Sequence, residues 1–426
     1  MNNPVKRICI VTTGQPSTNP RVVKEADALF QAGYDVHVIG GHWAEWADRF
    51  DEDLFKRIGW KFQYVGGFKH SKKWLYTWTR ARYKAARILA KSFRNIHWLG
   101  ERASGRVLPE LIRSARSVKA DLYIAHYLPA LIAAYHAAKA KHAKLGFDAE
   151  DFHSGQYSAL ENLWLRQIHE RIERQYIPLC DFVTCSSPLI GEAYASTCHI
   201  HLPTTLLNVF PMPQWPAKFR NGGPDNVLRL FWFSQSIAEG RGLEDVLKAM
   251  ALLRSHAVEL HLLGRFLTGY REKVYKMAEK WGLPHKNIIV YEPIQPEKIV
   301  NFGSGFDIGL ALETGRDKNN AMALSNKIFT YILSGNAVIG TDTEAQRPII
   351  NGLGEAGWLY RSGDTARLAE GIARWQENRD LLYRARLKSL QMGTDVYNWD
   401  KEKKKLLELV ERALSKDPLP CLRSRK

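Results

Sequence analysis

The chain has 426 residues and a formal net charge of +17, with 45% hydrophobic and 25% charged residues. This composition excludes a disordered or fibrous chain. The length exceeds a single hydrophobic core, because such cores stop growing at roughly 250–300 residues. We therefore expect two domains of about 200 residues each, and one large α/β domain is the alternative.

The positive charge is concentrated in one segment. Residues 56–119 contain 17 lysines and arginines but only two acidic residues, Glu101 and Glu110, an excess of 15. The rest of the chain is therefore nearly neutral. Such an asymmetry indicates an anionic partner and says nothing about the fold.

The cysteine pattern and the apolar runs indicate the compartment. The five cysteines form no CxxC pair, which argues against a disulfide framework or a zinc site and favours free thiols in a reducing compartment. They are Cys9, Cys180, Cys185, Cys198 and Cys421. No secretory apolar region opens the sequence, and no run approaches the ~18 apolar residues of a spanning helix. We expect a cytoplasmic protein that does not cross a membrane but can lie on one.

The first 210 residues alternate short apolar runs with helical patterns. The helix expected over residues 22–31 ends at Gly33 and places Lys24 and Asp27 on its outer face. The runs have the composition of buried parallel strands, expected over residues 8–12, 36–39, 122–125, 145–147 and 182–185. This order predicts β–α–β units in a doubly wound sheet.

A stretch rich in proline and glycine over residues 211–226 indicates a linker. A second β–α series follows it, with strands expected over residues 228–233, 260–263, 288–291, 308–312 and 337–341. We therefore predict an α/β protein with two Rossmann-like, doubly wound domains. The predicted parts are residues 1–210, a linker over 211–226, residues 227–395, a helical segment over 396–414 and a basic tail over 415–426.

Ligands of open α/β sheets bind outside the carboxyl ends of the strands, so the cleft between two such domains is the expected site. After the first strand, Gly14 allows a close approach of the backbone, and Asn19 can cap a helix that starts at Pro20. The free N–H groups of that helix offer an anion or hydroxyl site, although a purely structural cap is the alternative. No dinucleotide fingerprint or Walker lysine is present.

The most polar cluster of the first half follows a later strand. Asp148, Glu150, Asp151 and His153 place four titratable groups within six residues. Packing does not explain such a cluster, so we expect it to be functional. His126, at the end of the preceding strand, is a weaker candidate, because a histidine satisfied by one backbone hydrogen bond looks the same.

Two cations of the second half are placed to bind phosphate. Gln235 is expected at the end of the first strand there, and Gly240-Arg241-Gly242 opens the next helix. An arginine between glycines can bind a diphosphate with two hydrogen bonds while the backbone amides approach it. Lys327, near the start of a later helix, would complete a phosphate clamp. Taken alone, it is equally consistent with a solvated helix residue.

Several motifs together carry a family resemblance. They are STNPRVVKEA at 17–26, GYDV at 33–36, GRGLE at 240–244, LLG at 262–264, SNKIFTY at 325–331 with Ser334-Gly335, and YNW at 397–399. Their order resembles the retaining nucleotide-sugar glycosyltransferases of the GT-B fold, specifically glycosyltransferase family 4 (group 1), over nearly the whole chain. The resemblance implies that residues 1–210 bind the acceptor, that 227–395 bind the donor, and that the final helix returns to the first domain.

The resemblance also implies the roles of individual residues. Either Glu150 or His153 takes the place of the family's sugar-contacting histidine, and Glu150, Asp151 and His153 are the catalytic candidates. The donor, a UDP- or GDP-linked sugar, would be bound without a metal or another cofactor. Its expected contacts are Gly14, Gln235, Gly240, Arg241, Gly264, Pro293, Ile294, Glu313, Ser325, Asn326 and Lys327.

The chain departs from the family at one pattern. Family members commonly carry two glutamates eight positions apart, but Thr330 stands where the second is expected and Met322 eight residues before it. Either Glu313, Asn319 and Asn320 supply other contacts, or catalysis is impaired. The implied reaction is metal-independent transfer with retention, in which the cations stabilise the leaving diphosphate. A nucleotide-sugar 2-epimerase and a non-catalytic scaffold that binds sugar nucleotide or membrane are the alternatives.

The basic segment also contains many aromatic residues. Residues 69–94 hold nine cations and no acid, with Trp74 and Trp78 at helical spacing. This pattern is typical of a helix on an anionic membrane surface. Single-stranded nucleic acid, for which no motif is present, and a plain solvated helix are the alternatives. We expect a saccharide or lipid-linked acceptor at the inner membrane face, as in polysaccharide biosynthesis, with the acceptor or membrane surface formed by Lys72, Lys73, Trp74, Trp78, Arg80, Lys84 and Arg87.

Overall fold

The computed structural model describes residues 5–93, 95–157, 162–212, 226–253 and 257–415. The chain separates into two compact units. The first comprises Met1–Leu206, Asp317–Asn319 and Lys403–Lys426, and the second Leu207–Arg316 and Asn320–Glu402. Most of the predicted linker, the predicted tail after residue 415 and Cys421 lie outside the described residues. The other four cysteines are buried and free.

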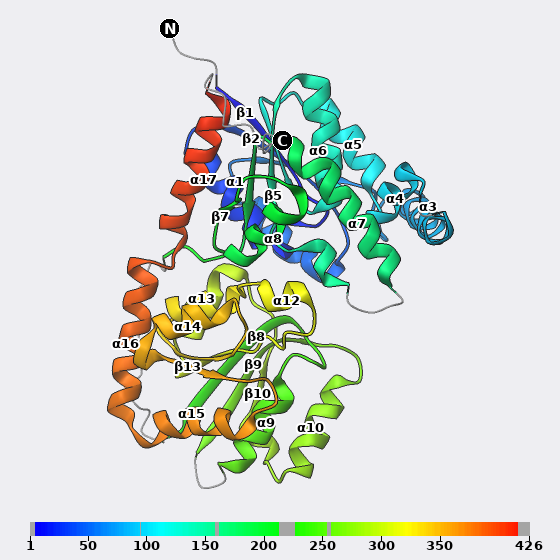
Figure 1. Ribbon diagram of the computed structural model, residues 1–426. Coiled ribbons are helices and arrows are strands. Elements are labelled where there is room, and N and C mark those ends of the chain that lie inside the picture. The colour runs from blue at the N-terminus through cyan, green and yellow to red at the C-terminus, as the bar shows by residue number, and fades with distance from the viewer. Residues whose placement is uncertain (1–4, 94, 158–161, 213–225, 254–256, 416–426) are drawn as a thin grey trace. The chain divides into compact units, whose positions relative to one another are not determined.

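The first unit is built on a parallel sheet of seven strands in the order β3-β2-β1-β4-β5-β6-β7 (Figure 1). The strands are β1 Arg7–Val11, β2 Asp35–Gly41, β3 Lys61–Val65, β4 Leu122–His126, β5 Lys144–Asp148, β6 Phe182–Cys185 and β7 Thr204–Thr205. The helices are α1 Pro20–Gln31, α2 Asp48–Phe55, α3 Lys73–Ser92, α4 His97–Ser104, α5 Leu108–Ser117, α6 Leu128–Lys141, α7 Leu163–Tyr176 and α8 Pro188–Cys198. The central strands β1, β4 and β5 are buried almost throughout, which explains their continuous apolar runs.

The second unit repeats the plan with six parallel strands in the order β10-β9-β8-β11-β12-β13. They are β8 Leu228–Ile237, β9 Val258–Phe266, β10 Ile288–Tyr291, β11 Ile308–Ala311, β12 Ala337–Thr341 and β13 Gly357–Tyr360. The helices are α9 Leu243–Leu252, α10 Tyr270–Lys280, α11 Ile299–Gly303, α13 Asn326–Leu333, α14 Gln346–Gly352, α15 Thr365–Glu377 and α16 Arg379–Asp395. Helices α12 (Lys318–Met322) and α17 (Trp399–Leu414) each contain residues of both units.

The prediction of two doubly wound parallel sheets is confirmed, but three strands were not predicted. β3, β7 and β13 are half-exposed, and each lies at an edge of its sheet. An edge strand that is partly solvated lacks the continuous apolar run by which a buried strand is identified.

Helix α1 begins at the predicted residue, but one face that was predicted to be exposed is buried. The Asn19 side chain accepts hydrogen bonds from the N–H groups of Arg21 and Val22, which is an N-cap, and Gly33 follows the helix with φ of +92°. The prediction that Lys24 lies on the outer face is wrong, since Lys24 is buried together with Arg21 and Glu25. This buried polar face positions the candidate site described below.

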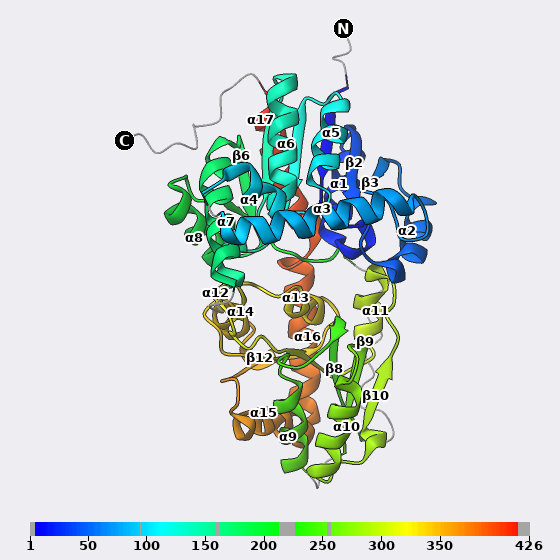
Figure 2. The same cartoon turned by 90° about the vertical axis from the view of Figure 1, so that its right-hand side faces the viewer.

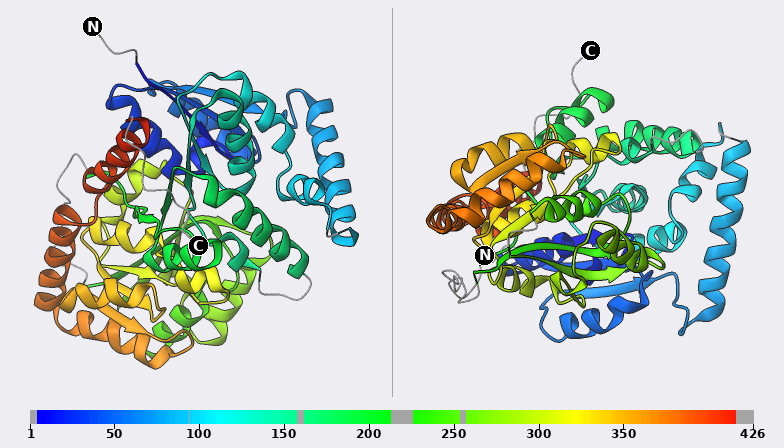
Figure 3. Two further views of the ribbon diagram at one scale, coloured as in Figure 1. Left: turned by 45° about the horizontal axis from the view of Figure 1, so that its top comes forward. Right: turned by 90° about the horizontal axis from the view of Figure 1, so that it is seen from below.

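Helix α3, which contains the basic and aromatic segment, lies at the margin of the first unit. Figure 2 shows it at full length along one side of that unit, and both views of Figure 3 place it at the edge. Its Thr79, Ala86 and Ala90 are buried. Trp74 and Trp78, on another face, are 74% and 57% exposed. No described helix is both long and apolar enough to span a membrane.

Candidate active site

The carboxyl ends of the central strands in the first unit meet a buried charge cluster. Its core is the guanidinium of Arg21 on α1, whose Nη2 and Nε lie 2.6 and 3.0 Å from Oδ2 of Asp148 at the end of β5. Nε of Arg21 also lies 3.4 Å from a carboxylate oxygen of Glu25. The members of the cluster are Arg21, Lys24, Glu25, His126, Asp148 and Glu150.

His126, the last residue of β4, lies between two carboxylates of this cluster. Its Nδ1 is 2.9 Å from Oε1 of Glu150, and its Nε2 is 3.2 Å from Oε2 of Glu25. The second contact has ion-pair distance without the alignment of a hydrogen bond. Burial alone would lower the pKa of His126, but the carboxylates raise it to about 10. His126 is therefore an imidazolium at neutral pH, held by two carboxylates and not by the single backbone hydrogen bond that the alternative interpretation assumed.

The other pKa shifts describe a network that is close to electrical balance. Burial, and then the neighbouring Arg21, lower the pKa of Lys24 to about 7. Burial raises the pKa of Glu25, whereas Arg21 and His126 overcome burial and hold the pKa of Asp148 below its usual value. Three basic groups thus face three carboxyl groups. Such a network is expensive to break, because removing one member leaves a buried partner without compensation.

Glu150 occupies a strained backbone position within the cluster. Its φ of +23° is uncommon for a residue with a side chain. The conformation is fixed by its N–H, which donates to Oδ1 of Asp148 at 3.0 Å, and by its carbonyl, which accepts a hydrogen bond from Ser186. The carboxylate accepts a further bond of 2.6 Å from Asn19 Nδ2. Backbone strain that is fixed in this way is typical of functional sites.

His153 lies in the same loop but has a different character. It is buried, and burial lowers its pKa to about 4, so the ring is neutral at physiological pH. Its Nε2 has no hydrogen-bond partner among the described residues, and its ring centroid lies 6.0 Å from that of Tyr127, which bonds Glu150. Asp151 is half-buried and accepts a hydrogen bond of 3.1 Å from Gln156.

The loop after β1 is closely packed around Gly14. A Cβ atom on Gly14 would lie 3.2 Å from Nε1 of Trp43 and 3.3 Å from the Thr18 hydroxyl. The Trp43 indole also donates to that hydroxyl at 3.2 Å. Gln15 holds the loop through its side-chain oxygen, which accepts bonds from the backbone of Trp43 and Ala44. The loop therefore lies directly against Trp43.

The charge cluster contains three residues whose ligand atoms could surround a cation. Atoms of Glu25, His126 and Asp148 all lie within 4.8 Å of one another. The set does not fit a metal ion, because a metal needs a neutral imidazole and His126 is protonated between its carboxylates. The Arg21 guanidinium already bonds Asp148 as well.

In the second unit, Glu313 is the centre of a polar site just after β11. Its carboxylate accepts a bond of 3.1 Å from Nζ of Lys327 and one of 2.7 Å from Nδ2 of Asn320. Ser325 caps α13 and also contacts the lysine. Burial alone would raise the pKa of Glu313, but Lys327 and these hydrogen bonds lower it. Lys327 is thus a buried, paired cation, so its reading as a solvated helix residue is wrong.

The loop that carries Arg241 reaches the same edge of the sheet. Gly240 and Gly242 have φ of +71° and +80°, and a Cβ on Gly242 would lie 2.9 Å from that of Leu312, next to Glu313. Burial, and then the neighbouring Arg316, lower the pKa of Arg241, while Glu313 opposes them. Arg241 thus lies near both Arg316 and Glu313, and Glu313 pairs with Lys327, so basic side chains gather at this edge of the sheet, which favours an anionic ligand.

The remaining residues that were predicted to bind the donor lie in different structural settings. Gln235 does not end its strand, since β8 continues to Ile237 through an irregularity between Phe233 and Ser236. Close packing explains the glycine at position 264, because a Cβ atom there would lie 2.1 Å from the Ser234 carbonyl oxygen. Pro293 and Ile294 form a half-buried loop after the edge strand β10. Asn326 begins α13.

Comparison with known proteins defines the class of fold. The sequence matches no family model and no curated protein. HepE of Anabaena, solved with UDP and glucose, has a TM-score of 0.68 at 13% identity over 95% of this chain and 99% of HepE. Sucrose-phosphate synthase of Thermosynechococcus elongatus has a TM-score of 0.65 at 13% identity, over 96% and 98%.

A third structure, a mutant of S. aureus TarM in complex with Fondaparinux, alpha-GlcNAc-glycerol and UDP, has a TM-score of 0.67 at 10% identity, over 95% and 99% of the two chains. These neighbours are glycosyltransferases of the GT-B fold, and the present chain shares that fold. At such low identity the likeness establishes the architecture of two Rossmann-like domains.

Proposed function

We propose that the chain is a glycosyltransferase whose second unit binds the diphosphate of a nucleoside-diphosphate sugar. The observation that carries the proposal is that two basic side chains gather after β8 and β11: Arg241, which lies near Glu313, and Lys327, which pairs with Glu313. The neighbours that were solved with UDP share the fold, so UDP is the first nucleotide to test. Bound phosphate oxygens would accept hydrogen bonds from Lys327, which also pairs with Glu313. They would also contact Arg241, because the glycines beside it let the loop backbone approach the ligand closely.

We further propose retention of configuration without a metal ion, as in family 4, which the motifs resemble. In this mechanism Arg241 and Lys327 stabilise the negative charge that develops on the leaving diphosphate. The charge cluster of the first unit keeps Glu150 fixed beside the His126 imidazolium. His153 supplies a neutral imidazole whose unpaired Nε2 can bond a sugar hydroxyl. These groups position the sugar. The acceptor hydroxyl oxygen then forms a bond to the anomeric carbon as the bond to the diphosphate breaks, and the hydroxyl proton passes to the leaving diphosphate.

Thermal unfolding with UDP, GDP, ADP and their sugars tests the donor site. A ligand at a hundred times its dissociation constant adds about 2.7 kcal/mol to the stability of the domain that binds it, which raises Tm by several degrees at roughly 2–4 °C per kcal/mol. We expect this shift with one nucleotide, its loss in Arg241→Ala, and its retention in the control Arg361→Ala, which removes an exposed arginine.

Turnover of the matching sugar nucleotide separates the remaining possibilities. Full turnover by Arg241→Ala would contradict the proposed role of this residue. Isomerisation of the free sugar nucleotide without an acceptor would identify the 2-epimerase instead, and binding without any turnover would identify the scaffold.

We also propose that α3 holds the first unit against an anionic membrane surface. Trp74, Trp78 and Leu89 of this helix are exposed, and lysines and arginines lie on the neighbouring faces. Exposed tryptophans beside cations are typical of helices that lie in the membrane interface. Each cation near such a surface contributes about 1 kcal/mol.

A further inference from the structure

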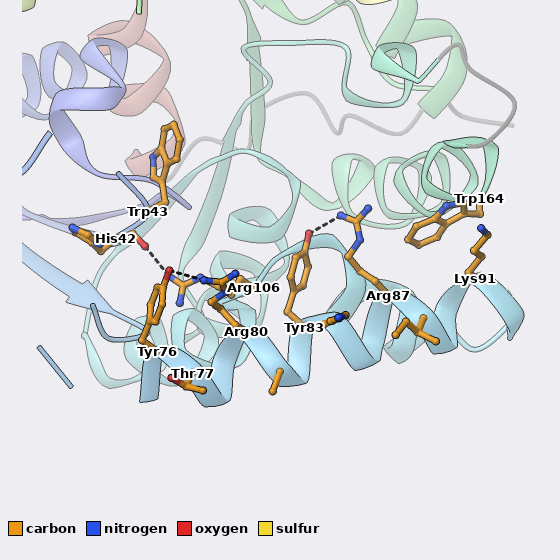
Figure 4. A pocket seen from close by; sticks show the side chains of 13 residues that line it. His42, Trp43, Tyr76, Thr77, Arg80, Tyr83, Arg87, Lys91, Arg106 and Trp164 are labelled. Atoms are coloured by element: carbon orange, nitrogen blue, oxygen red, sulfur yellow. Dashed lines mark hydrogen bonds between the residues drawn. The ribbon is translucent and has the colours of Figure 1, made fainter. Parts of the chain in front are cut away.

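A long groove lies between α3 and the rest of the first unit. Its volume is about 840 Å³. In Figure 4, Tyr76, Arg80, Tyr83 and Arg87 project from α3 to one side of the helix. The lining residues are His42, Trp43, Tyr76, Thr77, Arg80, Ala81, Tyr83, Lys84, Arg87, Ile88, Lys91, Arg106 and Trp164. Of the described residues that line it, five are lysines or arginines and none is acidic.

Three cations of this α3 groove have no carboxylate partner within the part of the chain that the structure describes. Among the described residues, no carboxylate pairs with Arg80, Lys84 or Arg87. The contrast is Arg82 of the same helix, which is absent from the lining and pairs with Glu110 at 2.6 Å. Unpaired cations that share one concave surface raise its positive potential, so the groove attracts an anion.

The aromatic rings of the groove are held in place by these cations. Nη1 of Arg80 donates to the Tyr76 hydroxyl at 3.2 Å, and Nη1 of Arg87 donates to the Tyr83 hydroxyl at 3.0 Å. The Arg87 guanidinium also lies 5.2 Å from the Trp164 ring centroid, a cation–π contact. Ring faces beside fixed guanidinium groups suit a ligand that alternates apolar C–H faces with charged substituents, as charged pyranose chains do.

The position of the groove connects it to the candidate active site of the same unit. At one end it is lined by Trp43, whose indole contacts the Gly14 loop through Thr18. From Tyr76 to Lys91 the groove follows α3 for roughly 22 Å at 1.5 Å per residue. A single lipid headgroup fills only a fraction of this length, so the dimensions favour an extended chain whose end reaches the Gly14 loop.

We propose that the α3 groove binds an acceptor saccharide that carries anionic groups, such as carboxylate, phosphate or sulfate, along its length. The assignment of this ligand as an acceptor rests on the proposed glycosyltransferase function. Binding of the saccharide itself does not, because the groove is formed within the first unit and needs no donor. The two proposals can therefore fail separately.

Direct binding to the full-length protein without nucleotide tests the proposal. We would titrate a sulfated pentasaccharide, neutral maltopentaose, anionic phosphatidylglycerol vesicles and a single-stranded oligothymidylate. The groove variant is Arg80→Gln/Lys84→Gln/Arg87→Gln. Its matched control is Lys276→Gln/Lys280→Gln/Lys286→Gln, which removes three exposed lysines of the second unit, and circular dichroism verifies folding. Trp74→Ser/Trp78→Ser changes α3 outside the groove.

We expect the sulfated pentasaccharide to bind in a salt-sensitive manner, since the contacts are ionic. The groove variant should weaken this binding about tenfold or more through the loss of three charge-assisted contacts, while the lysine control and the tryptophan variant stay within about twofold of the wild type. Equal affinity for maltopentaose, tighter binding of oligothymidylate, equal weakening in the lysine control, or binding only to vesicles would each overturn the proposal.

Discussion

Single residues of the candidate site have properties that follow from burial. His153 is neutral because taking a charged imidazole out of water is unfavourable, and Lys24 loses part of its charge for the same reason. His126 is equally buried, yet it is charged because two carboxylates contact it. The same residue type therefore supplies a neutral ring at 153 and a cation at 126, a difference that neighbours alone produce.

Acid sensitivity is the expected consequence of the neutral His153. Its pKa is about 4 in the folded chain and about 6.5 when unfolded. Between these values the unfolded state takes up the proton and the folded state does not, so stability falls as the pH drops from 6.5 towards 4. Between pH 7 and pH 5 the wild type should lose about 2 kcal/mol more than His153→Gln.

Urea unfolding at both pH values measures this difference. His201→Gln, which changes an exposed histidine, serves as the control and should keep the pH dependence of the wild type. A His153→Gln protein with an unchanged pH dependence would contradict the assignment of a neutral buried ring.

At the scale of elements, the charge cluster ties four of them together. Asp148 at the end of β5 accepts bonds from Arg21 on α1 and from Thr184 on β6, and His126 at the end of β4 lies between Glu25 and Glu150. The cluster thus fixes where α1 crosses the carboxyl edge of the sheet. It also holds the loop that carries Glu150 and His153.

Loss of one carboxylate from this cluster should be costly. Asp148→Asn leaves the buried Arg21 and His126 with too little negative charge, which typically destabilises a protein by about 3–5 kcal/mol. Asp53→Asn removes a carboxylate of the same residue type from an exposed pair with Lys56 and should cost less than about 1 kcal/mol. Chemical denaturation of the two variants compares them, and similar losses would show that the cluster does not stabilise the fold.

At the scale of the whole molecule, the positive charge is concentrated in one segment, which suggests a role in binding anionic partners. Nearly all of the net charge of +17 comes from residues 56–119, and part of it lines the α3 groove while the tryptophans of α3 face another way. One helix thus presents an ionic surface and an apolar one. We assign the first to a saccharide and the second to the membrane.

Binding to lipid vesicles tests the membrane assignment. The wild type should sediment with anionic vesicles at low salt and not with neutral ones, because the cations and the tryptophans act together. Trp74→Ser/Trp78→Ser should reduce the bound fraction, whereas Trp281→Ser in the second unit, a half-buried tryptophan after α10, should not. Undiminished sedimentation of the double variant would refute the assignment to these tryptophans.

Local sequence patterns were enough to predict the layered architecture and most of the elements that build it. Buried parallel strands such as β1, β4 and β6 are continuous apolar runs, and helix α1 has a readable cap at Asn19, because both signals are local. The edge strands β3, β7 and β13 were missed because half-solvated backbone needs no apolar run. The acidic loop from Asp148 to His153 was also predicted from the sequence, since its composition is unusual.

Which charged side chains contact one another became clear only from the folded chain. Lys24 was expected in water, but the helix turns it inward together with Arg21 and Glu25, and periodicity counts a charged side chain as solvent-facing. The partners His126 and Asp148 lie far away along the chain, in other strands of the sheet. Desolvation and pairing depend on distances in space, and no local pattern records them.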